Sequence, residues 1–222
     1  MPKEIESKQE RDKQAGVTRR GFLKGAGLTA AGAAILDAGL LGASEAAAAV
    51  AEPKVVGPGR VNISLRVNNQ IRRAEVEPRT TLAEALRFDL GLTGTKVVCD
   101  RGSCSACTVW LDDVPVCSCM TLAVDVGGRA VTTIEGLAEK NGARLHPIQE
   151  AFIEHDAMQC GFCTPGMIMS CAALLNQKQN PTLEDVKQAT SGNLCRCGTY
   201  PKVFEATLAA AQSGARRRKG DE

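Results

Sequence analysis

Ten cysteines among 222 residues are the feature of this sequence with the greatest chemical consequence. Five fall into one stretch, as Cys99-x4-Cys104-x2-Cys107 followed by Cys117 and Cys119. A C-x4-C-x2-C spacing with a remote fourth cysteine is typical of plant-type [2Fe-2S] binding. Glycine and other small residues separate these cysteines, so backbone N–H groups can approach the sulfurs and tune their charge. The spacing predicts an iron–sulfur cluster here, and structural zinc, which favours pairs of C-x2–4-C, fits less well.

The fourth ligand of this first set stays open between two residues. Cys117 and Cys119 stand two positions apart, and residues two apart on a strand point to the same face of a sheet. Spacing alone therefore does not choose between them.

The second set consists of two close pairs that are far apart in sequence: Cys160-x2-Cys163 and Cys195-x-Cys197. Each pair precedes a predicted helix, with Thr164-Pro165 and Tyr200-Pro201 expected to supply a cap and a proline at the first helical position. Two helix amino termini would then face a common centre. Their N–H groups and positive dipole ends suit a net-negative thiolate cluster.

The remaining sulfur and imidazole side chains are expected to be structural. Cys171 lies in an apolar helix and is predicted to be buried. His146 and His155 are expected to cap or to hydrogen-bond rather than to ligate, and Met158, Met167 and Met169 are assigned to the core. The sequence contains no Ser-His-Asp array, paired-carboxylate signature or phosphate-binding glycine loop. We therefore expect no substrate chemistry in this chain.

Two types of element must position these cysteines. Alternating apolar residues predict a hairpin over 61–67 and 71–76, a second over 108–111 and 114–116, and a strand over 129–134. A short helix capped by Thr80-Thr81 should end at Gly91, and helices are predicted over 147–157, 165–177, 183–190 and 202–212. The pattern changes near Leu137, which predicts a β-rich domain over 60–136 and an all-helical domain over 137–212.

Composition excludes some classes of function. The 27 basic and 25 acidic residues leave a net charge of +2, and aromatic residues make up 3% of the chain, which argues against nucleic-acid binding. The basic run within 213–222 is interpreted as a solvated, charged tail.

The amino-terminal residues 1–51 are interpreted as an export signal. Thr18-Arg19-Arg20-Gly21-Phe22-Leu23-Lys24 resembles a twin-arginine motif, and small residues up to position 51 offer A-x-A-like cleavage points. The apolar stretch between them is rich in Gly and Ala and contains Asp37, which is unlike a stable membrane span. The expected location is the periplasm, with the signal cleaved.

Five motifs in order resemble the small iron–sulfur subunit of the molybdenum hydroxylases, the xanthine dehydrogenase and aldehyde oxidase family. They are Cys99-Asp100-Arg101-Gly102-Ser103-Cys104-Ser105-Ala106-Cys107-Thr108-Val109, Thr132-Thr133-Ile134-Glu135-Gly136, His146-Pro147-Ile148-Gln149, Gln159-Cys160-Gly161-Phe162-Cys163-Thr164-Pro165-Gly166 and Gly192-Asn193-Leu194-Cys195-Arg196-Cys197-Gly198. The resemblance covers about residues 60–212. It implies an α+β protein, with an amino-terminal β-grasp, ferredoxin-like domain followed by an all-α four-helix domain, each binding one [2Fe-2S] cluster.

The resemblance also implies a role for each cysteine. One cluster would be held by Cys99, Cys104, Cys107 and Cys119, and the other, nearer the molybdenum, by Cys160, Cys163, Cys195 and Cys197. Cys119 is preferred over Cys117 because a stretch similar to residues 120–123 follows the family's fourth ligand. Gln159 and Cys197 match positions that contact the molybdopterin cofactor. Ser105 departs from the glycine that is usual in the family, and Cys117 is an additional thiol.

By the same resemblance, the chain is expected to be the electron-transfer subunit of an oxidoreductase complex. Electrons would leave a molybdopterin centre in a large partner subunit and pass through two [2Fe-2S] clusters to a flavin (FAD) subunit or a cytochrome. The expected reaction is oxidation of an aldehyde to a carboxylic acid, as in the exported periplasmic aldehyde dehydrogenases. The alternatives are the same role in an isoquinoline-type or carbon monoxide dehydrogenase, a stand-alone ferredoxin-like carrier, and a zinc-stabilised interaction module.

Overall fold

The first hairpin opens the part of the chain that the structure describes. The structure is a computed structural model, and it describes residues 57–138 and 144–220, with 214–220 described as backbone alone. Strands β1 (Val61–Val67) and β2 (Gln70–Val76) pair antiparallel around Asn68 and Asn69, whose φ angles are 50° and 62°. Two left-handed residues give the type I′ turn that matches strand twist. The predicted hairpin is confirmed.

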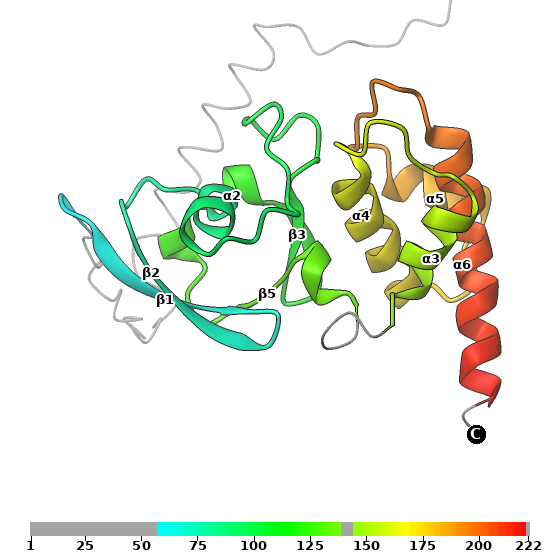
Figure 1. Cartoon of the computed structure of the whole chain (residues 1–222), viewed down its shortest axis with the longest axis horizontal. Coiled ribbons are helices and arrows are strands. Elements are labelled where there is room, and N and C mark those ends of the chain that lie inside the picture. Colours follow the sequence, from blue (N-terminus) through cyan, green and yellow to red (C-terminus); the bar gives the residue numbers. More distant parts are fainter. Residues whose placement is uncertain (1–56, 139–143, 221–222) are drawn as a thin grey trace, which may run out of the picture. The chain divides into compact units, whose positions relative to one another are not determined.

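The second hairpin is built in the same way. Strands β3 (Thr108–Leu111) and β4 (Val114–Cys117) flank Asp112 and Asp113, which also have positive φ angles. Strand β5 (Ala130–Thr132) lies between β1 and β3, parallel to the first and antiparallel to the second, in the order β2-β1-β5-β3-β4 (Figure 1). The mixed sheet is as predicted, but β5 is shorter than 129–134 because a 3-10 turn begins at Ile134.

One short helical segment crosses this sheet. Helix α2 (Leu82–Glu84) has Thr81 as a capping-box residue and continues as a π-helical turn over Ala85–Asp89. Leu82 and Leu86 are fully buried in a cluster with Leu65, Val67 and other strand residues. The sheet and this helical segment therefore form one hydrophobic core.

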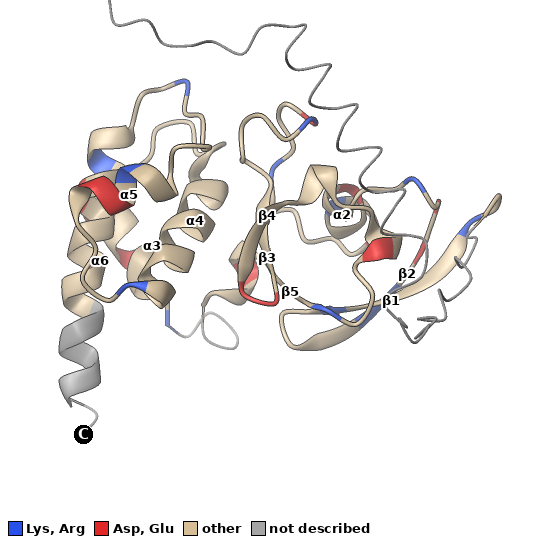
Figure 2. Ribbon diagram, turned by 180° about the vertical axis from the view of Figure 1, so that it is seen from behind, with Lys and Arg blue, Asp and Glu red and all other residues tan. Residues whose placement is uncertain are grey.

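Within the described residues, four helices follow the sheet, as predicted. They are α3 (Pro147–Glu154), α4 (Thr164–Gln177), α5 (Leu183–Ala189) and α6 (Tyr200–Gly220). Helix α4 is the central one, since residues 166–173 are all buried and it carries no charged side chain (Figure 2). Helix α6 begins two residues earlier than predicted and continues to 220, so most of the predicted tail is helical.

The core assignments are confirmed for three residues and wrong for one. Met167, Met169 and Cys171 are fully buried. Met158 is 43% exposed, because α3 ends at Glu154 and Met158 belongs to the loop that leads to Cys160. His146 caps α3, with its Nδ1 accepting from the Ile148 amide at 3.3 Å.

Strand β3 packs against helix α4 and so joins the sheet to the helices. Trp110 on β3 is buried in the helical core, and its Nε1 donates to the Met169 carbonyl oxygen at 3.0 Å. Division into independent domains at 60–136 and 137–212 stays a prediction. In the described residues, no helix combines the length and apolar character that a membrane span needs. The signal predicted over 1–51 lies outside the described residues.

Candidate metal centres

The loop that carries Cys99 and Cys104 aims its backbone amides at sulfur. The Ser103 amide donates to the Cys99 sulfur at 3.3 Å, and the neighbouring Gly102 amide donates to the Cys119 sulfur at 3.4 Å. Positive φ angles at Asp100 (54°) and Gly102 (71°) turn the loop so that both amides point inward. Adjacent donors therefore bring together two cysteines that are 20 positions apart in sequence.

The other cysteines of the first set complete a compact group of thiols. The Arg101 backbone and the Cys104 thiol both help to lower the pKa of Cys99. Burial and the Cys119 thiol both help to raise the pKa of Cys107, so each pair of thiols is close. Cys104, Cys107 and Cys119 are all buried. The structure thus brings together the four residues that the resemblance selects.

Cys117 is close to this group but has a different environment from Cys119. Strand β4 ends at Cys117, and residues Ser118–Met120 form a 3-10 turn. The expectation that Cys117 and Cys119 share one face of a strand is therefore wrong. The Cys117 thiol lies 3.7 Å from the Ser105 hydroxyl and 3.9 Å from the Gly102 carbonyl oxygen, and it lines a separate pocket. Burial and the Cys107 and Cys99 thiols raise the pKa of Cys117, so this thiol is close to the set as well. Cys119 as the fourth ligand stays a prediction.

Ser105 adopts the left-handed conformation that glycine tolerates better, with a φ angle of 53°. Its carbonyl oxygen accepts from the Thr108 hydroxyl at 2.7 Å and from the Asn193 side-chain amide at 3.2 Å. These bonds explain how a non-glycine residue is held in this conformation.

The segment before Cys99 is held by a residue of the Thr132–Gly136 motif. Glu135 accepts from the Gly94 amide at 2.8 Å and from the Thr133 hydroxyl at 2.6 Å. A Cβ atom at Gly94 would lie 2.4 Å from the Ile134 Cγ2 atom, so this close approach needs glycine. Glu135 thereby holds the backbone that leads into the cysteine loop. The sequence motif alone did not predict this role.

The second set also forms two thiol pairs. The backbone and the thiol of Cys160 both affect the pKa of Cys197, and burial and the Cys195 thiol raise the pKa of Cys163, so each pair of thiols is close. Helix α4 starts directly after Cys163, and the Cys195 sulfur is 3.2 Å from the Thr199 hydroxyl, just before α6. The amino termini of both helices therefore lie near this set, as predicted.

The predicted caps of these two helices are wrong. The cap residue of α4 is Cys163 rather than Thr164, and it makes no side-chain capping bond. Helix α6 starts at Tyr200, whose hydroxyl bonds to residues before the helix instead of to its first amides. In both cases the helix begins one position earlier than the proline suggested.

The thiol pKa values differ between the edge and the interior of the sets. Hydrogen bonds from the backbone at Arg101 and Ser103 lower the pKa of Cys99 to about 7. Burial raises the pKa of Cys195, but the hydroxyl and amide of Thr199 more than offset it and bring the value to about 7. Burial raises the pKa of Cys104 and Cys107, and that of Cys163 to about 12. The buried thiols therefore need a positive metal nearby to ionise.

A cavity of about 460 Å³ lies between the two sets. It is lined by Cys99 and Cys104 from the first set and by Cys160, Cys163 and Cys195 from the second. The Leu194 amide donates to the Cys104 carbonyl oxygen at 3.1 Å, so the chain beside Cys195 is bonded to a cysteine of the other set. The two sets are direct neighbours.

The residues of each set fit a binuclear cluster. In the described part of the chain, no three His, Cys, Asp or Glu side chains are arranged to hold a single metal ion. Each set instead offers four thiols as two pairs, and the first set also offers amide donors at 3.3 and 3.4 Å. Four thiolates with N–H···S bonds are the donor set of [2Fe-2S] centres.

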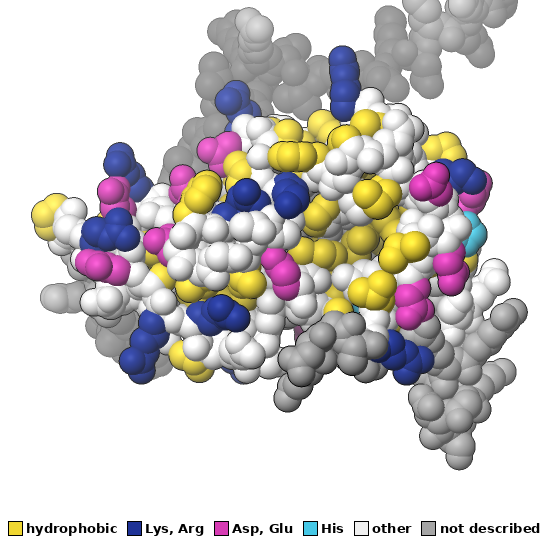
Figure 3. Space-filling model, in the orientation of Figure 1, with side chains coloured by type: hydrophobic (Ala, Val, Ile, Leu, Met, Phe, Trp, Pro, Cys, Tyr) yellow, Lys and Arg dark blue, Asp and Glu magenta, His cyan; other side chains and the backbone are white. Residues whose placement is uncertain are grey.

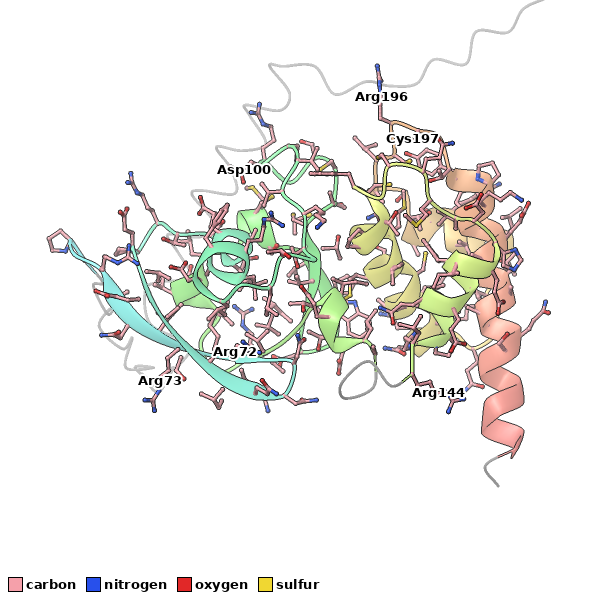
Figure 4. The ribbon with its side chains drawn as sticks, in the orientation of Figure 1. Arg72, Arg73, Asp100, Arg144, Arg196 and Cys197 are labelled. Carbon is pink, nitrogen blue, oxygen red and sulfur yellow. The ribbon has the colours of Figure 1, made fainter. Side chains whose placement is uncertain are left out.

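Gln159 and Cys197 lie where the second set reaches the surface. Gln159 and Cys160 are exposed, and Cys197 is half-buried. Figure 4 shows Cys197 in the loop before α6, with the Arg196 side chain pointing away from the molecule. The exposed side chains of Phe162 and Leu194 belong to the same two loops.

Comparison with protein families gives two matches. Residues 65–128 match the 2Fe-2S iron-sulfur cluster binding domain, and residues 133–208 match the [2Fe-2S] binding domain. Together these matches cover most of the sheet, except β5, and the helices as far as residue 208 in α6.

Individual relatives include complete small subunits. The aldehyde oxidoreductase iron-sulfur-binding subunit PaoA of Escherichia coli K12 is 40% identical over 210 residues, covering 88% of each chain. The nicotine 6-hydroxylase small subunit of Paenarthrobacter nicotinovorans is 49% identical over 151 residues, covering 68% of this chain and 90% of that one. A chain of quinoline 2-oxidoreductase from Pseudomonas putida 86 superposes with a TM-score of 0.68 at 41% identity, covering 72% of this chain and 98% of that one.

Proposed function

This chain belongs to the small iron–sulfur subunits of the molybdenum hydroxylases, and we propose that it serves a complex that oxidises aldehydes to carboxylic acids. Its own part is electron transfer through two [2Fe-2S] clusters. The substrate is bound and oxidised elsewhere, since the described residues offer thiols rather than acid–base groups at the site.

The observation that carries the aldehyde assignment is the extent of the match to PaoA. That match covers 88% of this chain, whereas residues 57–222 are only 166 of its 222 residues. The similarity therefore extends into the amino-terminal segment. The match to the small subunit of nicotine 6-hydroxylase covers 68% of the chain. A relative that shares this segment is the better guide to the whole complex.

Hydroxylation of an aromatic N-heterocycle is the second candidate. It is supported by the 49% identity to the nicotine 6-hydroxylase small chain and by 44% identity to a nicotinate dehydrogenase chain of Pseudomonas putida. Both relatives match about two thirds of the chain, less than PaoA does.

We assign Cys99, Cys104, Cys107 and Cys119 to one cluster and Cys160, Cys163, Cys195 and Cys197 to the other. When bound, each cluster accepts and releases one electron at a time. The chain keeps the two sites adjacent, buries most of the first set, and supplies amide donors to the Cys99 and Cys119 sulfurs. Hydrogen bonds to sulfur and burial are the means by which a protein sets a cluster potential.

The partner that delivers electrons is a large subunit with the molybdopterin cofactor. Its docking face is the surface that carries Gln159 and Cys197, where Phe162 and Leu194 are 52% and 57% exposed. On the face shown in Figure 3, hydrophobic side chains gather over the helices and their loops with few charges among them. Exposed apolar groups of this kind favour a protein partner. An FAD subunit or a cytochrome would accept the electrons.

The complex is proposed to act in the periplasm after twin-arginine export. A route for folded proteins suits this chain, because ligated cysteines are protected from the oxidising compartment. Replacing both Arg19 and Arg20 with Lys should leave the complex in the cytoplasmic fraction, while Arg11→Lys should not. Unchanged export of the double variant would contradict this proposal.

The test of function uses the chain purified with its partners. We expect about four iron atoms per chain, visible absorption that dithionite bleaches, and bleaching by small aliphatic or aromatic aldehydes under anaerobic conditions. Bleaching by nicotinate or quinoline but not by aldehydes would support the second candidate instead. A colourless, zinc-containing chain would contradict electron transfer, and a coloured chain that never associates with a molybdenum protein would indicate a stand-alone carrier.

A further inference from the structure

The Tyr200 hydroxyl connects three parts of the second cysteine set. It accepts a hydrogen bond from the Cys195 amide at 2.8 Å and donates one to the Asn193 carbonyl oxygen at 3.2 Å. Tyr200 is the first residue of helix α6, so the phenol ties the loop before the helix to the helix itself. One phenol oxygen therefore holds the backbone of two residues of this loop at once.

The loop that Tyr200 holds is the same one that bridges the two cysteine sets. The Leu194 amide donates to the Cys104 carbonyl oxygen at 3.1 Å, and the Asn193 side-chain amide donates to the Ser105 carbonyl oxygen at 3.2 Å. Every residue from Asn193 to Cys195 is thus hydrogen-bonded either to Tyr200 or to the first cysteine loop. We name residues 193–195 the bridging loop.

The tyrosine ring is held firmly enough to fix this loop. It packs on the helical core and lies 6.3 Å from the Phe204 ring, centroid to centroid, one turn further along α6. Side chains four apart on a helix lie on one face, so the Phe204 side chain packs next to the Tyr200 ring. The hydroxyl position is therefore set by the helix rather than by the loop.

We propose that Tyr200 is a positioning residue that holds the bridging loop and thereby sets the potential of the helical-half cluster and its coupling to the ferredoxin-like cluster. The inference rests on the proposed function, because it takes Cys195 as a cluster ligand. Tyr200 contacts the backbone of that ligand and not its sulfur, so it acts through Cys195.

The direction of the effect follows from the Cys195 amide. In the intact protein the phenol oxygen occupies this N–H group and keeps it from sulfur and from water. Without the hydroxyl, the amide is free to donate toward sulfur, or to bind a water that enters the adjoining cavity, which Tyr200 lines, and that itself donates to sulfur. A reduced cluster carries one more negative charge, so either new donor stabilises the reduced form and raises the potential.

The test is Tyr200→Phe in the complex with its partners, because this change removes the hydroxyl and keeps the ring. Redox titration followed by electron paramagnetic resonance measures both cluster potentials and the magnetic interaction between the reduced clusters. Cys195→Ser and Cys99→Ser identify which signal belongs to which set. We expect full iron content, an upward shift of the helical-half potential, a changed magnetic interaction and an unchanged ferredoxin-like potential.

Thr207→Val is the matched control. It removes a buried hydroxyl from the same helix, where Thr207 donates to the Val203 carbonyl oxygen and not to the bridging loop. We expect both potentials to stay unchanged. Phe204→Leu serves as the second variant if Tyr200→Phe loses iron. It removes the ring that packs against Tyr200 but keeps the Tyr200 hydroxyl, so it should raise the helical-half potential by a smaller amount.

Three results would overturn the inference. The first is a Tyr200→Phe variant with full iron content whose cluster potentials and magnetic interaction are unchanged. The second is a shift of the helical-half potential in Thr207→Val equal to that in Tyr200→Phe. The third, if Tyr200→Phe does not retain its iron, is a Phe204→Leu variant with full iron content whose helical-half potential is unchanged. A complete absence of both signals from the unaltered complex would instead overturn the proposed function, and this inference with it.

Discussion

Individual thiols in this chain differ in what surrounds them, and Cys117 and Cys119 are the pair for which that difference matters most. Cys119 is 6% exposed, lies beside Cys107 and receives the Gly102 amide. Cys117 lies next to the Ser105 hydroxyl on the edge of another pocket. Both an amide and a hydroxyl donor lower a thiol pKa, so burial and the amide bond, rather than the hydroxyl, distinguish Cys119 from Cys117.

The first prediction compares these two cysteines. Cys119→Ser should remove the resonance signal of the ferredoxin-like cluster and about half of the iron, because a buried ligand is lost. Cys117→Ser should retain both signals. Electron paramagnetic resonance and iron analysis of the two variants provide the measurement, and retention of both signals in Cys119→Ser would reverse the assignment.

The second prediction concerns Cys171, the buried thiol that belongs to neither set. Burial raises its pKa to about 11, with the Thr207 hydroxyl acting in the opposite direction. The folded value lies above the unfolded one, so the protonated thiol stabilises the fold fully below about pH 9, and this stability is lost as the pH rises toward about 11.

We therefore expect the unaltered protein to lose about 2 kcal/mol of unfolding free energy from this group by about pH 11. Cys171→Ala should show a smaller loss over the same range, although it is less stable at neutral pH because of the vacated volume. Urea unfolding at about pH 8 and about pH 10.5 measures the difference. Equal losses in both proteins would contradict a raised pKa at this position.

At the scale of elements, helix α4 approaches the first cysteine loop more closely than a side chain allows. A Cβ atom at Gly166 would lie 2.2 Å from the Ser105 carbonyl oxygen and 3.0 Å from the Ala106 Cα atom. Backbone atoms cannot rotate out of the way. The glycine therefore sets the distance between the helix that follows one cysteine set and the loop that carries the other.

The third prediction is that Gly166→Ala is destabilising. Alanine favours a helix over glycine by up to about 1 kcal/mol, but overpacking against rigid neighbours costs about 1–3 kcal/mol or more. The cost of the clash should exceed the gain in helix propensity, so the variant should be less stable. It should also hold less iron in the first set. Gly128→Ala is the control, because its Cβ atom meets nothing within 4 Å. Urea midpoints and iron content that are the same in both variants would argue against this close packing.

At the scale of the whole molecule, the described residues of the sheet and of the helices share buried contacts. Trp110 lies on β3 yet packs in the helical core, and its indole N–H bonds to the Met169 carbonyl oxygen on α4. The bridging loop also joins the two cysteine sets at this interface between the sheet and the helices, which we call the seam. Electron transfer needs a fixed distance between sites, and a packed seam provides one.

The fourth prediction tests this seam. Trp110→Ala should lower the unfolding free energy by about 3–5 kcal/mol, because it empties a large buried volume. Trp110→Phe should lower it by only about 1–2 kcal/mol, since it removes the N–H bond but keeps most of the ring. Urea unfolding monitored by circular dichroism reports on the helices, and cluster absorption reports on the sites. A change confined to one of these two signals would mean that the halves are independent.

Local patterns in the sequence determined the elements and the chemistry of this chain. Alternating apolar residues around Asn68-Asn69 and Asp112-Asp113 predicted both hairpins, because turn type and strand period depend on neighbouring residues. The same holds for the helices and for the cysteine spacings, which predict iron–sulfur binding but leave the fourth ligand of the first set open. These features lie within a few residues of one another, so local rules suffice.

Only the tertiary structure decided how distant groups meet. The 3-10 turn at Ser118 separates Cys119 from Cys117, and the end of α3 exposes Met158. Trp110 finds its partner 59 residues away, and the Tyr200 hydroxyl binds a loop instead of capping a helix. Side-chain direction at the end of an element, and the choice of a partner across a seam, depend on how whole elements pack, and no short stretch of sequence contains that information.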